Sequence, residues 1–247
     1  MILIIGSTHD DLLYFESVMT RRREEKVLGH FRVVFGNVFN QEVALVEGVY
    51  SNYVSSMITL DLIQKYYVIL VFAVGRCTAL TRNWKLGDIA VSRYTVAGDV
   101  DLMLESDTRL GQIPGCPAYF ASQEDIVSYF NTQAERRIDA TFRLSTFVST
   151  NSSYASRSQL DEMLSGDRAF GTNENLVMEN SVGGIAVACH FGHVPFLGAK
   201  VVSRFLDEPY TVEEYATTLR KYIDLGKAVV STIGDIGRSD LLGGQEE

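Results

Sequence analysis

Side chains that can exchange protons or bind anions gather in five short segments, each near the end of an apolar run or beside a predicted turn. These segments are residues 6–11, 75–81, 149–154, 178–181 and 203–207. They contain the carboxylates Asp11, Glu179 and Asp207 and the arginines Arg76 and Arg204. A carboxyl group acts as a general acid or base, and a guanidinium binds phosphate or carboxylate through paired hydrogen bonds. The five segments are therefore the candidate ligand site.

The elements that must position these segments follow from the hydrophobic pattern. Apolar, β-branched runs predict strands at residues 1–6, 31–38, 42–47, 67–74, 87–92, 143–149 and 196–203. Helices are predicted at residues 10–24, 53–65, 122–137, 157–164, 181–190 and 212–233, and loops at 75–84 and 95–120. The run 67–74 has no polar alternation, which is typical of a strand covered on both faces.

Alternating strands and helices predict an α/β fold with three layers, α/β/α, around a mixed central sheet. One domain at residues 1–238 is sufficient, and residues 239–247 are predicted to form a disordered tail. Ligands in such folds bind at the carboxyl ends of the strands, where the connecting loops converge. That rule is the reason to inspect the five polar segments together.

Composition excludes several classes of function. A net charge of −9 over 247 residues argues against a nucleic-acid partner, which usually meets a basic surface. No apolar run reaches the roughly 18 residues of a membrane span, and residues 1–5 are too short for a signal peptide, so we expect no membrane association and a cytoplasmic location.

Metal and disulfide chemistry are not expected either. Cys77, Cys116 and Cys189 lie far apart, which predicts reduced, buried thiols. The pair His190 and His193 has a spacing that a metal would accept, but the neighbouring glycine, valine and proline favour a helix end or a turn. We expect neither a metal nor a cofactor.

A set of strings spread along nearly the whole chain resembles one known family. The most distinctive is GQIPGCPA at residues 111–118, and IIG at 4–6, VAL at 43–45, KLGDI at 85–89, CH at 189–190 and VPF at 194–196 keep the same order and spacing. In this respect the chain is similar to the methylthioadenosine/S-adenosylhomocysteine nucleosidases of the purine nucleoside phosphorylase superfamily. The resemblance implies a nucleoside phosphorylase/nucleosidase-like fold.

For that family the resemblance implies hydrolysis of the bond between adenine and a 5'-thio-ribose, with a small-molecule nucleoside as the ligand. An acid protonates the departing purine, and carboxylates position the ribose hydroxyls and the attacking water. The resemblance also implies a homodimer in which the partner completes the 5' end of the pocket. The corresponding loop holds Val100, Leu102 and Met103, and Tyr50 and Tyr53 lie beside the expected interface helix; an ordinary core loop is the alternative.

The chain departs from the family's pattern at the catalytic positions. Arg76 stands where the resemblance implies a small hydroxyl residue, and Arg204 replaces the general acid. Ser181 falls on the glutamate that holds the ribose diol, and Asp11 is one methylene shorter than the glutamate that helps activate water. An alternative alignment, which needs an insertion in the following helix, matches residues 178–179 to the family's Met-Glu pair instead.

Other candidate site residues follow from the same alignment. The aromatic residue that covers adenine is replaced within residues 149–153, with Tyr154 one place away, and Asp207 would serve as an acid only if its loop were rebuilt. The expected ligand-binding residues are Arg76, Cys77, Ser149, Tyr154, Glu179, Asn180 and Ser181.

Two added arginines at one site admit three interpretations. The arginines bind an anionic metabolite, or they pair internally as Arg204 with Asp11 and Arg76 with Glu179, or they point to solvent. Three functions remain open accordingly. The leading one is a nucleoside- or anion-binding homologue with a degraded hydrolytic centre. The alternatives are an active nucleosidase or phosphorylase with a rebuilt site, and a scaffold or interaction protein.

Overall fold

Ten strands and five helices make up the computed structural model of the chain, which describes residues 1–138, 140–152, 175–206, 208 and 212–236. The strands are β1 (Ile2–Ile5), β2 (Thr20–Val27), β3 (Phe31–Val38), β4 (Gln41–Val46), β5 (Leu70–Ala79), β6 (Ile89–Ala97), β7 (Phe120–Ala121), β8 (Phe142–Ser149), β9 (Leu176–Glu179) and β10 (Phe196–Phe205). The helices are α1 (His9–Val18), α2 (Asn52–Lys65), α3 (Glu124–Arg137), α5 (Val182–Gly192) and α6 (Val212–Ile236).

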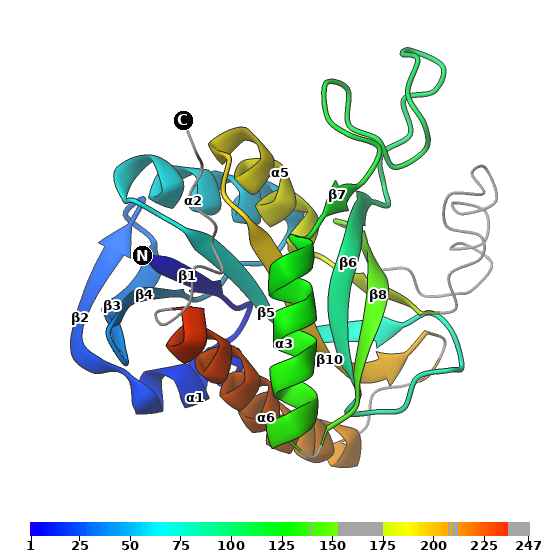
Figure 1. Ribbon diagram of the computed structural model, residues 1–247. Coiled ribbons are helices and arrows are strands. Elements are labelled where there is room, and N and C mark those ends of the chain that lie inside the picture. The colour runs from blue at the N-terminus through cyan, green and yellow to red at the C-terminus, as the bar shows by residue number, and fades with distance from the viewer. Residues whose placement is uncertain (139, 153–174, 207, 209–211, 237–247) are drawn as a thin grey trace.

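All ten strands belong to one mixed sheet. Along its main path the order is β10-β6-β8-β9-β5-β1-β4-β3-β2, and β7 pairs with β6. Strand β10 also pairs with β5, in parallel, so β5, β10, β6, β8 and β9 close into a ring. Strands β1, β4, β3 and β2 extend from the ring as an open sheet (Figure 1). The sheet therefore curls on one side and stays open on the other.

Helices cover both faces of this sheet because its central strands are apolar on both sides. In β1, Ile2 and Ile4 pack in one core cluster with residues of α1, α3 and α6, whereas Leu3 and Ile5 pack in a second cluster with residues of α2 and α5. Successive side chains of a strand point to opposite faces, so a run of four isoleucine and leucine residues feeds both cores. The predicted three-layer α/β/α architecture with a mixed sheet is confirmed (Figure 1).

The helix predicted at residues 10–24 is wrong in its second half. Helix α1 ends at Val18, Met19 is extended, and residues from Thr20 form strand β2. The Arg- and Glu-rich stretch has good local helix propensity, but it pairs antiparallel with β3 from Val27↔Phe31 onward. Tertiary hydrogen bonding has overridden the local preference.

The loop predicted at residues 75–84 is also partly wrong, because β5 continues to Ala79. Gly75, Arg76 and Cys77 pair in parallel with Lys200, Val201 and Val202 of β10. The short strand β9 was not predicted, and β6 extends to Ala97 rather than ending near residue 92. The predicted helix at 157–164 and the predicted tail at 239–247 lie outside the described residues, and the domain boundary at 238 stays a prediction.

Two sequence predictions about single residues can be compared with the structure. The three thiols are free and buried. His193 is the C-terminal cap of α5 in the left-handed conformation, with φ of 52° and ψ of 39°, which agrees with the predicted helix end.

Among the described helices none combines the length and the apolar character that crossing a membrane requires.

Candidate functional site

A cavity of about 380 Å³ opens at the ends of five strands, where the sequence predicted the site. Its walls come from the segments after β1 and β8, from Tyr50 before α2, from the second half of β5, from β9 and the turn that follows it, and from the end of β10. The predicted site residues that line it are Arg76, Cys77, Glu179, Asn180 and Arg204. The rule that ligand sites form where strands end and loops converge has therefore selected the correct segments.

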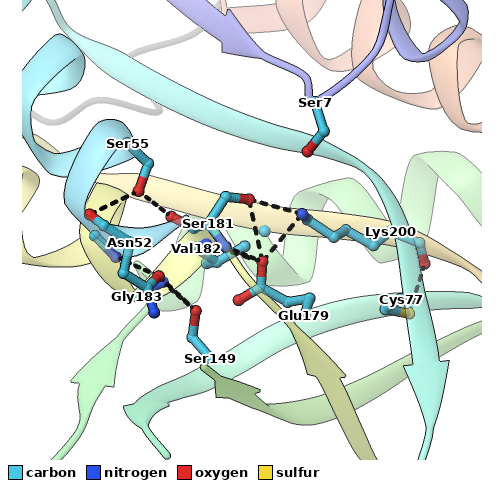
Figure 2. A network of polar contacts seen from close by, with 12 residues as sticks. Ser7, Asn52, Ser55, Cys77, Ser149, Glu179, Ser181, Val182, Gly183 and Lys200 are labelled. Atoms are coloured by element: carbon cyan, nitrogen blue, oxygen red, sulfur yellow. Dashed lines mark hydrogen bonds and ion pairs between the residues drawn. The ribbon is translucent and has the colours of Figure 1, made fainter. Parts of the chain in front are cut away.

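Glu179, which lines the cavity, belongs to a fully buried ion pair (Figure 2). Lys200 Nζ lies 3.0 Å from Glu179 Oε2, and each side chain is only 1% exposed. Glu179 Oε2 also accepts hydrogen bonds from Ser181 N at 2.7 Å and Val182 N at 2.9 Å. The carboxylate thus caps the N-terminus of α5, where the helix dipole favours a negative charge.

Ser181 completes the network. Lys200 Nζ donates to Ser181 Oγ at 2.9 Å, and this hydroxyl donates to Glu179 Oε2 at 3.1 Å. Burial alone would raise the pKa of Glu179, but the charge of Lys200 and the backbone donors at the start of α5 outweigh it, so the pKa lies below its ordinary value. Glu179 is therefore an ionised group with no proton to donate at neutral pH.

These contacts correct the internal pairing that the sequence suggested. The cation paired with Glu179 is Lys200 on β10, not Arg76. Sequence reasoning missed Lys200, although one signal was present, since this lysine interrupts the otherwise apolar run at residues 196–202. A buried charge in a central strand requires a partner, and that requirement points toward a carboxylate on a neighbouring strand.

Ser149 lies beside the cavity in a second polar network rather than on the cavity wall (Figure 2). Its hydroxyl donates to Asn52 Oδ1 at 2.8 Å and accepts from Gly183 N at 2.9 Å. Asn52 Oδ1 accepts in addition from Gly184 N. Ser149 therefore joins the first turns of α2 and α5. Its predicted contact with a ligand, like that of the buried Ser181, stays a prediction.

Asp11 lies next to Gly75 of β5, and it accepts a hydrogen bond from Ser7, a residue that lines the cavity. Its Oδ2 accepts from Ser7 N at 3.0 Å and from Thr8 N at 2.8 Å, and Oδ1 is buried without a hydrogen-bond partner among the described residues. Gly75 has a φ of +127°, and a Cβ built there would lie 3.0 Å from Asp11 Oδ2. Glycine at this position thus permits both the backbone conformation and the close approach of the carboxylate.

The charge state of Asp11 reflects opposing effects. Burial raises its pKa, and the hydrogen bond from Thr8 together with the nearby charges of Lys200 and Arg76 offsets this only in part. The net direction is upward. Asp11 is therefore a buried carboxyl group beside the cavity whose pKa lies above its ordinary value.

Arg204 reaches the cavity because β10 is irregular at its end. Val202 pairs with Cys77 and Arg204 with Thr78, so Ser203 is an extra residue in β10, and both Ser203 and Arg204 line the cavity. Arg204 Nε donates to Thr78 Oγ1 at 2.8 Å. No carboxylate in the part of the chain that the structure describes forms an ion pair with Arg204, so the predicted pair with Asp11 is wrong. The charges that lower the pKa of Asp11 are those of Lys200 and Arg76.

The cavity therefore has a positive wall. Arg76 and Arg204 line it, the charge of Glu179 is compensated by Lys200, and Glu179 is the one carboxylate among the described lining residues. The buried Cys77 thiol has a pKa raised by desolvation and is not a nucleophile. Tyr154 and Asp207, two further predicted site residues, lie outside the described residues.

The fold and the position of the cavity define a class of protein, and comparison with known families agrees with it. The chain belongs to the phosphorylase superfamily, whose family model matches residues 1–233. The resemblance inferred from the sequence is thereby confirmed.

Particular relatives are nucleosidases. The chain is 28% identical over 203 residues to a 5'-methylthioadenosine/S-adenosylhomocysteine nucleosidase of Staphylococcus haemolyticus, covering 82% of this chain and 86% of the relative. The solved structure of the nucleosidase of that name from Neisseria meningitidis, in complex with methylthio-immucillin-A, superposes with a TM-score of 0.84 at 20% identity over 95% of this chain and 98% of the other. The futalosine hydrolase of Helicobacter pylori gives a TM-score of 0.82 at 20% identity, covering 95% and 97%.

Proposed function

We propose that the chain binds a nucleoside or nucleotide in this cavity and catalyses little or no hydrolysis of its N-glycosidic bond. The observation that carries the proposal is the position of Arg204. This residue lines the cavity at the end of β10 and donates a hydrogen bond to Thr78. This is the position at which the family resemblance places the general acid. The relatives' substrates and bound inhibitor supply the ligand class.

The chemistry of purine departure supports the loss of hydrolysis. A purine leaves readily only when it takes up a proton, and a guanidinium has none to give at neutral pH. Glu179 does not substitute for the acid because its ion pair with Lys200 lowers its pKa.

An active nucleosidase or phosphorylase is the second candidate, and one observation favours it. Asp11 has a raised pKa and a carboxyl oxygen, Oδ1, without a partner among the described residues, so it offers a group that takes up and releases protons beside the cavity. In that case Arg76 would bind phosphate or orient the substrate. A scaffold that binds no nucleoside is the third outcome of the experiments below.

Two assays separate these functions. Purified protein is incubated with methylthioadenosine, S-adenosylhomocysteine, futalosine and inosine, each with and without phosphate, and free base is measured by chromatography. We expect turnover far below about 1 per second, and a rate above that value in any mixture would refute the loss of activity. Thermal-shift measurements with the same compounds then test binding.

Matched variants make the binding test specific. The double variant Arg76→Gln and Arg204→Gln removes both cavity charges, and we expect it to lose the rise in melting temperature that inosine induces in the wild type. Arg22→Gln is the control, because this arginine lies on the exposed strand β2. Equal melting shifts in the wild type, the double variant and the control would show that the ligand binds elsewhere, and no shift with any nucleoside would favour the scaffold.

A homodimer and a cytoplasmic location form part of the same proposal. Exposed apolar side chains on and near α2 (Tyr50, Tyr53 and Met57) and in the loop after β6 (Met103 and Leu104) support an interface. Tyr50 also lines the cavity, so a partner would meet the site there. Light scattering should give twice the chain's mass of 27.5 kDa, and Tyr53→Glu should shift it to the monomer value.

A further inference from the structure

The side chain of Arg204 is held in one orientation by its neighbour on β5. Its Nε donates to Thr78 Oγ1 at 2.8 Å, and Thr78 is itself buried and lines the cavity. A guanidinium carries five donors in a rigid plane, so fixing Nε also fixes the direction of the two terminal nitrogens. Within the described chain only Nε of Arg204 is hydrogen-bonded to a protein group. The terminal donors form a preset fork.

A fork of two donors matches some purines and not others. The edge of a 6-oxopurine presents two neighbouring acceptors, N7 and O6, whereas adenine presents the acceptor N7 beside the donor N6 amino group. Guanidinium groups bind the first edge through two hydrogen bonds. When the same two donors meet adenine, the hydrogen bond to O6 is lost. One guanidinium N–H then faces the N6 amino group, which is also a donor.

From this geometry we propose that Arg204 makes the cavity selective for 6-oxopurine nucleosides, of the inosine and guanosine type, over adenosine-type nucleosides. The inference rests on the proposed function, since it requires the purine to lie against the end of β10. The remaining charges act in the same direction. Arg76 adds a second positive group, and Glu179, the carboxylate among the described lining residues, is bonded to Lys200 and to the start of α5. The wall therefore favours an acceptor-rich base edge.

Calorimetric titration of the wild type with inosine, guanosine and adenosine tests the selectivity. We expect the oxopurine nucleosides to bind at least about tenfold more tightly, which corresponds to about 1.4 kcal/mol. The 7-deaza analogue of guanosine lacks the N7 acceptor and should lose most of this advantage. That comparison uses only the wild-type protein, so it does not depend on the folding of a variant.

Arg204→Gln supplies the second test, because a glutamine amide presents one donor and one acceptor and matches adenine N7 and N6. The ratio of the inosine and adenosine dissociation constants should fall at least tenfold and favour adenosine, whereas Arg22→Gln should leave the ratio unchanged.

The two proposals fail in different ways. Wild-type protein that binds inosine and adenosine equally well, or Arg204→Gln protein with an unchanged ratio, would overturn the selectivity and leave nucleoside binding intact. Wild-type protein that binds no nucleoside would overturn the proposed function and the selectivity together.

Discussion

Replacing Lys200 by methionine would leave the Glu179 carboxylate buried without its cation. The two atoms are 3.0 Å apart and both side chains are 1% exposed, so water cannot replace the lost charge. Glu179 would then take up a proton, because a neutral carboxyl group is less costly to bury than an unpaired carboxylate. Moving its pKa from the ordinary 4.5 to above pH 7 costs about 3.4 kcal/mol at about 1.36 kcal/mol per unit. We therefore expect Lys200→Met to lower the free energy of unfolding at pH 7 by about 3 to 4 kcal/mol, within the range for broken buried pairs.

The pH dependence of this loss distinguishes it from simple repacking. In the wild type the pKa of Glu179 is lowered, so its stabilising contribution is present above pH 4.5 and is lost as the pH falls through the folded-state pKa. In Lys200→Met the pKa is raised, and the variant gains stability as the pH falls from 7 toward 4.5. The difference between the two proteins should therefore be about 2 to 3 kcal/mol smaller at pH 5 than at pH 7, because the cost of ionising Glu179 in the variant falls by about 1.36 kcal/mol per pH unit.

Urea unfolding followed by circular dichroism at pH 7 and pH 5 measures both quantities. The exposed Lys26→Met on β2 is the matched control and should change stability by less than about 0.5 kcal/mol. A loss that is the same at both pH values would refute the reasoning, because it would show that the missing volume of lysine, not its charge, causes the destabilisation.

Three further predictions follow from the same region. Adding Glu179→Gln to Lys200→Met should restore at least about 1 kcal/mol at pH 7 in the urea assay, because the amide carries no charge; a double variant less stable than Lys200→Met would contradict the pairing. Burial raises the pKa of Asp11, so the ionised carboxylate destabilises the wild type as the pH rises above 3.8. Melting temperatures measured from pH 3.5 to 7 should therefore show Asp11→Asn becoming more stable relative to the wild type as the pH rises. A difference in melting temperature that is constant with pH would be evidence against this. Gly75→Ala should lower the free energy of unfolding by about 1–3 kcal/mol, because Gly75 has a φ of +127° and a Cβ there would contact Asp11. Gly48→Ala is the control, since Gly48 has a φ of +81° and no neighbouring atom in the way. Equal losses in the two variants would assign the whole effect to the backbone conformation.

The sequence predicted the central strands well because their signal is local. The apolar residues of β1 and the first part of β5 have no polar alternation, and burial on both faces is the physical cause of that pattern. Strand β2 was mistaken for helix because its charged residues have no such pattern. Its structure depends on hydrogen bonds to β3, which lie outside any local window.

The candidate site shows the same division. Its segments were predictable, because the ends of apolar runs mark the ends of strands. The pairing of Glu179 with Lys200 was not predictable from the sequence. The two residues come together only because β9 and β10 both pair with β5 in their particular registers. The orientation of Arg204 depends likewise on the irregularity at Ser203.

Closure of five strands into a ring has a consequence for how copies of this chain meet in solution. A closed ring offers no row of unpaired backbone groups, so β2 is the long unpaired border of the sheet in the described part of the chain. Arginine, glutamate and lysine side chains occupy β2 from residue 21 to residue 26, and most are exposed. Mutual repulsion and the desolvation of these groups discourage strand-to-strand aggregation, so the charges that misled helix prediction also protect the protein from forming intermolecular sheets.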